Sequence, residues 1–185
     1  TVYGGITENP LLSSCEEAAA LAAEKKAAFV VGIGGGSPLD AAKAIAALAA
    51  NPGLDREGFF KKAWKTPPLP IVLIGTTSGT GSEVSPTSVL TVDGVKKSVS
   101  GPELYASLAI ANPAYTGTMS YNTTVSTGLD AFCHAVEGYF SPACDDITGY
   151  LAEKAMPMVY RGLKMMRPEI CLLYTSPSPR DKRQS

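Results

Sequence analysis

The sequence predicts an α/β fold that leads into the start of an all-helical domain. Two short apolar runs, at residues 29–33 and 71–74, have the length of strands that are buried on both faces. Helical segments separate the strands in the first half, whereas residues 115–164 are mostly helical in pattern. Strands that alternate with helices and then give way to helices alone indicate an α/β domain at 1–112 and part of a helical domain at 113–168.

The first elements are predicted from composition and turn signals. Ala, Glu and Lys dominate residues 15–28, which is typical of a helix, and Ser13 or Ser14 stands where a helix cap belongs. The strand at 29–33 ends in a tight glycine turn, and a strongly Ala-rich helix follows at 39–50. After this helix we predict a polar connection, rich in proline, up to the next strand.

The later elements follow the same logic. A hairpin is predicted where two strand-like runs flank Asp93-Gly94, because this dipeptide favours a tight turn. A short strand ends at Asn112-Pro113, and the helical pattern begins beyond it. The predicted ranges are 71–74, 88–92, 97–100 and 108–111 for strands, and 123–140 and 148–165 for helices.

Composition narrows the classes of function. Lys and Arg number 16 against 17 Asp and Glu, and no basic stripe carries interleaved aromatic residues, so we expect no nucleic-acid partner. The apolar runs are far too short to cross a bilayer, so we expect no membrane association. Four cysteines without a C-x-x-C pair do not suggest a disulfide framework, and we expect reduced thiols and a cytoplasmic location.

The glycine turn at residues 34–37 suits a phosphate group. Glycines let the backbone approach a pyrophosphate, and the first N–H groups of the following helix are donors at the positive end of its dipole. Neither the G-x-G-x-x-G fingerprint nor a P-loop fits, because Ser37 takes the place of the last glycine and no Gly-Lys-Ser/Thr follows. A strand-to-helix turn without a ligand remains the alternative.

A second loop, at residues 75–83, combines glycines with five hydroxyl side chains directly after a predicted strand. Ligands of open α/β sheets collect beyond the carboxyl ends of the strands, so two such loops are expected to face one crevice. A solvated surface loop is the alternative, which the density of hydroxyls and the near absence of charge disfavour.

Asp130 and His134 are four residues apart in a predicted helix and therefore share a face. A carboxylate and an imidazole placed in this way can converge on one divalent metal ion. The spacing also fits an aspartate that orients a histidine by hydrogen bonding. Two ligands are fewer than the three that a stable catalytic site needs, and His134 is the single histidine of the chain.

Three segments together resemble the iron-containing (group III) alcohol dehydrogenases. They are residues 34–43 (GGGSPLDAAK), 76–84 (TTSGTGSEV) and 127–137 (TGLDAFCHAVE), in this order and at this spacing. The resemblance covers roughly residues 2–166. It implies a dinucleotide-binding α/β domain followed by a helical domain, in the architecture of dehydroquinate synthase, and it implies a chain that is truncated at both ends.

The resemblance also implies roles for particular residues. Asp130 and His134 match the first two metal ligands, and no further catalytic residue is implied. Lys97 resembles the lysine that contacts the cofactor, although Lys96 beside it competes for this role. The remaining residues are implied to bind NAD or NADP, with the pyrophosphate on the first three: Gly35, Gly36, Ser37, Asp40, Thr76, Thr77 and Thr80.

The implied activity is hydride transfer between a nicotinamide cofactor and a primary or secondary alcohol or aldehyde, assisted by Fe²⁺, with Zn²⁺ as a possible substitute. The family would also imply a homo-oligomer at full length. Two alternatives stand beside it: a relative resembling glycerol dehydrogenase or dehydroquinate synthase, and a nucleotide-binding module without catalysis. The sequence around Asp130 speaks against the first alternative.

The end of the chain departs from the family. Residues 169–185 resemble the translation of a sequencing adapter and are predicted to be a non-native tail, so they are excluded from fold reasoning. The family supplies two further histidine ligands beyond His134, and this sequence contains neither. We therefore expect the 185-residue chain to be inactive and to bind metal weakly.

Overall fold

The computed structural model describes residues 1–166, so the predicted tail at 169–185 lies outside the described residues. The chain divides into two compact units. The first contains residues 1–76 and 81–112, and the second contains residues 77–80 together with the chain from Pro113 onward. The short segment 77–80 therefore groups with the helices, although the sequence on both sides of it belongs to the first unit.

The first unit is built on a parallel sheet of three strands, β1 (Val30–Gly34), β2 (Ile71–Gly75) and β5 (Leu108–Ala111), in the order β1-β2-β5. In the register of the sheet, Gly34 lies opposite Gly75, so β1 and β2 end at the same level. Both loops that follow these strands consequently leave the sheet from its carboxyl edge, as the sequence predicted.

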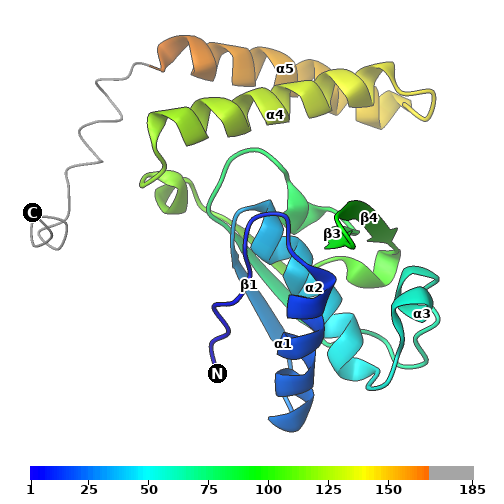
Figure 1. Ribbon diagram of the computed structural model, residues 1–185. Coiled ribbons are helices and arrows are strands. Elements are labelled where there is room, and N and C mark those ends of the chain that lie inside the picture. Colours follow the sequence, from blue (N-terminus) through cyan, green and yellow to red (C-terminus); the bar gives the residue numbers. More distant parts are fainter. Residues whose placement is uncertain (167–185) are drawn as a thin grey trace, which may run out of the picture. The chain divides into compact units, whose positions relative to one another are not determined.

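Helix α2 (Gly36–Ala50) is the centre of the first unit. It packs against β1, β2 and β3 (Thr87–Val92), and helix α1 (Leu12–Glu24) also packs on it (Figure 1). A helix that is covered on all sides needs small or apolar residues around its whole circumference. This accounts for the alanine-rich sequence of α2, in which eight apolar residues are buried: Leu39, Ala41, Ala42, Ala44, Ala46, Ala47, Leu48 and Ala49.

The prediction that β1 is buried on both faces is wrong for the described chain. Gly32 is buried, toward Ala42 of α2 and Leu73 of β2, whereas the alternate residues Val31 and Ile33 are exposed. Successive side chains of a strand point to opposite faces, and α2 covers only one of them. An apolar run shows that a strand is hydrophobic on both sides, but it does not show what covers each side.

Two other local predictions need correction. Ser13 and Ser14 lie inside α1, which begins after Leu11 and has no side-chain hydrogen bond at its N-cap. The connection between α2 and β2 contains a short helix, α3 (Arg56–Phe60), which Asp55 caps by accepting a hydrogen bond from the Gly58 N–H. Helix α3 places Phe59 in the main hydrophobic cluster, fully buried, and the sequence reasoning missed it.

The hairpin formed by β3 and β4 (Val95–Ser100) is confirmed. Its turn at Asp93-Gly94 has positive φ at both residues, 51° and 76°, which is the conformation that matches the twist of a two-residue hairpin. Three short 3₁₀ helices complete the elements of residues 1–166, and they are η1 (Ser82–Val84), η2 (Pro102–Leu104) and η3 (Pro113–Thr116). The first of them directly follows the loop that leaves the end of β2.

The second unit contains two long helices that pack against each other, α4 (Tyr121–Phe140) and α5 (Asp146–Met165) (Figure 1). Ser120 caps α4 by accepting a hydrogen bond from the Thr123 N–H, and Asp145 caps α5 through the Thr148 N–H. The predicted helices at 123–140 and 148–165 agree with these two helices to within two residues at their starts. Neither they nor any other helix within residues 1–166 combines the length and apolar character needed to cross a membrane.

Candidate functional site

The glycine turn joins β1 to the first turn of α2. Gly34 has a φ of +144°, and a Cβ there would lie 2.7 Å from the Pro38 ring, so only glycine fits this corner. Gly35 is the N-cap of α2 and Gly36 its first residue. The N–H groups that open a helix have no partner within it, so the turn offers backbone donors to an anion, as predicted.

The hydroxyl-rich loop, which we define as residues 75–81, leaves the end of β2. Its beginning is tied to the glycine turn by one backbone hydrogen bond, in which the Thr76 N–H donates to the Gly34 carbonyl oxygen at 2.8 Å. Thr76 is therefore brought beside the glycine turn. Thr77 and Thr80, which the sequence also assigned to the cofactor site, belong to the second unit.

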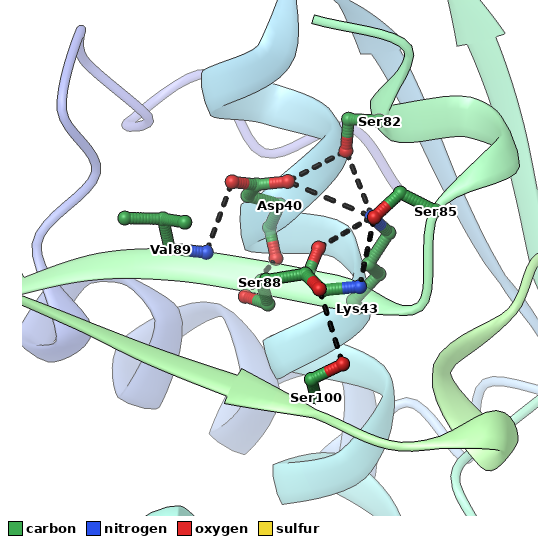
Figure 2. A network of polar contacts seen from close by, with 8 residues as sticks. Asp40, Lys43, Ser82, Ser85, Ser88, Val89 and Ser100 are labelled. Atoms are coloured by element: carbon green, nitrogen blue, oxygen red, sulfur yellow. Dashed lines mark hydrogen bonds and ion pairs between the residues drawn. The ribbon is translucent and has the colours of Figure 1, made fainter. Parts of the chain in front are cut away.

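A buried polar network follows this loop and connects it to α2 (Figure 2). Lys43 is fully buried, and its Nζ donates to the Ser82 Oγ at 2.8 Å and to the Thr87 carbonyl oxygen at 2.6 Å. The Asp40 carboxylate lies 3.6 Å from the same Nζ and accepts a hydrogen bond from the Ser82 hydroxyl at 2.6 Å. Its other oxygen accepts from the Val89 N–H at 2.9 Å.

Two electrostatic effects act in opposite directions on Lys43 in this network. Burial lowers the pKa of Lys43, while the carboxylates of Asp40 and Glu83 partly restore it by favouring the charged ammonium group. The Ser88 hydroxyl, also buried, donates to the Asp40 main-chain oxygen at 2.7 Å and links β3 to α2. No side-chain nitrogen or oxygen that is buried in the described residues lacks a hydrogen-bond partner, so the network is fully satisfied.

Within the second unit, the hydroxyl-rich loop touches helix α4. A Cβ at Gly79 would lie 2.8 Å from the Thr127 carbonyl oxygen and 2.9 Å from its Cβ, so only glycine allows this approach. Thr127 precedes Asp130 by three residues and His134 by seven, and these spacings place all three on one side of the helix. The loop therefore meets α4 on the side that carries the predicted metal ligands.

Asp130 and His134 lie beside each other on α4, as the spacing predicted. The His134 Nε2 is 3.8 Å from the Asp130 Oδ1, and the side chains are 53% and 45% exposed. An imidazole and a carboxylate are donors that suit Fe²⁺ or Zn²⁺, and both are open to solvent. Residues 1–166 contain no group of three or more His, Cys, Asp or Glu side chains that could hold an ion, so these two donors are a partial set.

Lys97, the third part of the predicted cofactor site, lies on strand β4 of the hairpin. It is exposed on β4, and its Nζ lies 5.8 Å from the centre of the Phe60 ring of α3. Leu90 and Thr91 lie opposite Lys97 and Lys96 in the hairpin register, so the two lysines point to opposite faces. A cofactor contact by Lys97 stays a prediction, as does direct binding by Asp40.

The sequence reasoning missed Lys43, Ser82 and Ser88 as polar members of the core. A signal was present, because Asp40 and Lys43 are the only charged residues of α2 and stand three apart among alanines. That spacing places them on neighbouring positions of one helix face. Their partners on η1 and β3 lie about forty residues later, as shown by separations of 39 for Ser82 and 44 for Thr87, and local pattern contains no information about them.

Two family models match the chain. The model described as iron-containing alcohol dehydrogenase matches residues 1–113. The model described as the C-terminal part of the Fe-containing alcohol dehydrogenase family matches residues 124–169. The first model therefore covers the part of the chain that contains the sheet, and the second covers the part that contains the two long helices.

Individual proteins agree with the family models. A long-chain-alcohol dehydrogenase of Geobacillus thermodenitrificans is 39% identical over 166 residues, which are 88% of this chain and 42% of that protein. The crystal structure of an iron-containing alcohol dehydrogenase from Thermotoga maritima superposes with a TM-score of 0.84 at 37% identity, over 92% of this chain and 48% of that one.

A second Thermotoga maritima structure, titled as an NADH-dependent butanol dehydrogenase, gives a TM-score of 0.77 at 33% identity and covers 86% of this chain and 41% of that one. The chain thus spans less than half the length of each of these three relatives. These structures bear out the predicted fold class, a dinucleotide-binding α/β domain followed by helices.

Proposed function

The chain belongs to the iron-containing alcohol dehydrogenase family, and from this premise we propose that it contributes the nicotinamide-binding part and half of the metal site of a dehydrogenase that interconverts alcohols and aldehydes. One observation supports this most. Two ligand-facing loops, the glycine turn and the hydroxyl-rich loop, leave adjacent parallel strands at the same level and are joined by the hydrogen bond from Thr76 to Gly34.

The residues have distinct tasks in this proposal. The backbone of Gly35, Gly36 and Ser37 holds the pyrophosphate at the helix N-terminus, where close approach and aligned N–H donors favour an anion. Thr76, Thr77 and Thr80 line the remainder of the cofactor, and Lys97 is assigned a further contact on the resemblance. NAD is the cofactor that the NADH-dependent relative supports, and NADP stays an alternative.

Asp130 and His134 would hold the metal ion on α4. When bound, Fe²⁺ supplies Lewis acidity toward an alcohol oxygen, and the nicotinamide supplies a hydride acceptor. The contribution of this chain is orientation: Gly79 of the hydroxyl-rich loop packs on the Thr127 side of α4, so the loop assigned to the cofactor contacts the helix that carries the metal-binding residues. A cytoplasmic location and assembly into a homo-oligomer at full length complete the proposal.

Replacing Gly36 with Ala tests the cofactor site. Alanine favours helix at this position, so α2 should persist, but its methyl group would stand where the pyrophosphate must approach the backbone. We expect NADH to bind the 185-residue chain about tenfold more weakly in Gly36→Ala, as measured by the fluorescence of the bound nicotinamide. Gly162→Ala is the matched control, because a Cβ there meets nothing within 4 Å. Equal affinity in all three chains would remove the glycine turn from the site.

The metal site is tested by metal content. We expect Fe²⁺ or Zn²⁺ to bind the chain weakly, since only two donors are present in residues 1–166, and we expect no oxidation of ethanol with NAD. Asp130→Ala and His134→Ala should each abolish the residual binding in a calorimetric titration, whereas Glu137→Ala should leave it unchanged. Metal binding that survives both substitutions would favour the alternative of a nucleotide-binding module without catalysis.

A further inference from the structure

The hydroxyl-rich loop is fastened to the strand–helix element β1–α2 at both of its ends. At its beginning, the Thr76 N–H donates to the Gly34 carbonyl oxygen. Directly after its end, the Ser82 hydroxyl donates to Asp40 at 2.6 Å and accepts from Lys43 at 2.8 Å. Figure 2 shows both charged side chains of α2 directed at Ser82. Between the two attachments, the loop spans only residues 77–81.

The second attachment is unusual in its chemistry. The ammonium group of Lys43 is held fully buried in a helix whose other buried residues are all apolar, which carries a desolvation penalty that a well-packed apolar side chain would avoid. A buried polar network of this kind specifies one geometry, because each donor and acceptor must meet its partner. Lys43 binds the Ser82 hydroxyl and the Thr87 carbonyl oxygen, and thereby sets the path of the chain on both sides of Ser85.

Asp40 is connected to the end of the hydroxyl-rich loop through Ser82. Both of its carboxylate oxygens accept hydrogen bonds from within the unit, one from Ser82 and the other from the Val89 N–H. Asp40 lies one turn of α2 beyond Gly36, on the helix whose N-terminus is the glycine turn. A rigid helix therefore connects the phosphate-facing turn to the anchor of the hydroxyl-rich loop.

We propose that Asp40 and Lys43 are positioning residues for the dinucleotide, which hold the end of the hydroxyl-rich loop through Ser82 at a fixed distance from the Gly35–Ser37 turn. The inference rests on the proposed function and deepens it. The glycine turn alone binds the pyrophosphate, whereas the fastened loop is needed for the part of the cofactor that extends beyond it. Removing the Ser82 contact should then weaken the binding of the whole dinucleotide more than the binding of a nucleoside diphosphate, which lacks the nicotinamide half.

The test compares two ligands, NADH and ADP, on the 185-residue chain and three variants. Ser82→Ala removes the anchor and leaves the contacts of Lys43 with Asp40 and Thr87. Ser88→Ala is the matched control, because it removes an equally buried hydroxyl that binds the Asp40 main chain and not the loop. Lys43→Met removes the ammonium group at similar length, and Ser82→Ala decides the question if that variant does not fold.

We expect Ser82→Ala and Lys43→Met to weaken NADH binding about tenfold and to change the affinity for ADP by less than about twofold. Ser88→Ala should leave the affinity for both ligands unchanged. A purely structural role would weaken NADH and ADP equally, and that result would overturn the proposal, as would unchanged NADH affinity in Ser82→Ala. If the unsubstituted chain bound neither ligand, the proposed function would fail and this inference with it. An unsubstituted chain that binds ADP but not NADH would contradict the proposed nicotinamide-binding function, whereas NADH binding that Ser82→Ala leaves unchanged would overturn this inference alone.

Discussion

The α/β unit and the helical pair differ in how much of their apolar surface is buried. The first unit has two buried apolar clusters, one with Phe59 and Leu90 and the other with Leu73, and all three side chains are fully buried. Within the described part of α4 and α5 only Ala152 is buried, and large apolar side chains such as Leu151 and Phe140 are exposed. Little of the apolar surface of α4 and α5 is buried, so the two units should respond differently to perturbation.

The contrast also separates two kinds of functional residue. The candidate cofactor loops rest on a unit that holds them by buried hydrogen bonds, as Lys43 and Ser82 illustrate. The candidate metal ligands rest on α4, where Asp130 and His134 are about half exposed. Precise geometry requires a supporting shell of packed or hydrogen-bonded neighbours. We therefore expect cofactor binding to be the more robust property of this chain.

The largest expected difference between the units is thiol reactivity. Burial, with smaller contributions from Glu16 and Asp40, raises the pKa of Cys15 in α1 to about 12, whereas Cys133 of α4 is exposed. A thiol with that pKa is thiolate in roughly one molecule in ten thousand at pH 8, and the thiolate is the reacting species. In chains in which Cys15 or Cys133 is the single remaining cysteine, a disulfide reagent should label Cys133 at least about a thousandfold faster than Cys15.

Comparable labelling rates of Cys15 and Cys133 would show that the first unit opens as readily as the second.

The Cys15 thiol also leads to a prediction about the pH dependence of stability. Because the folded pKa is raised, the contribution of Cys15 is fully present below pH 9 and is lost as pH rises toward 12. The free energy of unfolding should therefore fall more steeply over this window in the original chain than in Cys15→Ala, measured by urea titration.

A matched pair of phenylalanines gives the next largest effect. Phe59 is fully buried and Phe140 is 76% exposed. We expect Phe59→Ala to lower the free energy of unfolding of the first unit by about 3–5 kcal/mol, through lost burial and the cavity that remains. Phe140→Ala should change the free energy of unfolding of the helical pair by less than about 0.5 kcal/mol. Equal effects in urea-induced unfolding would contradict the division into a packed unit and an exposed helical pair.

The smallest expected effect concerns the start of α5. The Asp145 carboxylate accepts a hydrogen bond from the Thr148 N–H, and this bond lowers the pKa of Asp145 below its usual value. Its stabilising effect is present at neutral pH and is lost as pH falls through the lowered pKa. Asp145→Asn should keep most of the helical circular dichroism and Asp145→Ala should reduce it slightly, with the difference from the original chain disappearing in acid. A pH-independent difference would exclude capping by the carboxylate.

Local pattern predicted much of the fold for identifiable reasons. The Asp93-Gly94 turn and the helix ending at Phe140 each depend on contacts between neighbours in sequence, and the strand at 108–111 is marked by its short apolar run before Asn112-Pro113. Patterns failed where distant elements decide the outcome. Whether a face of β1 is covered depends on where α2 packs, and whether Phe59 is buried depends on the position of the main cluster relative to a five-residue helix.

By itself, the sequence determined the order of the strands and of the four longer helices, the position of the glycine turn, and the shared helix face of Asp130 and His134, because all of these follow from local spacing and backbone preference. Only the tertiary structure decided that Lys43 is buried against Ser82 and that Gly79 meets the backbone at Thr127. Such contacts join residues about forty or more positions apart, and their energies come from desolvation and close packing that no local window of sequence contains.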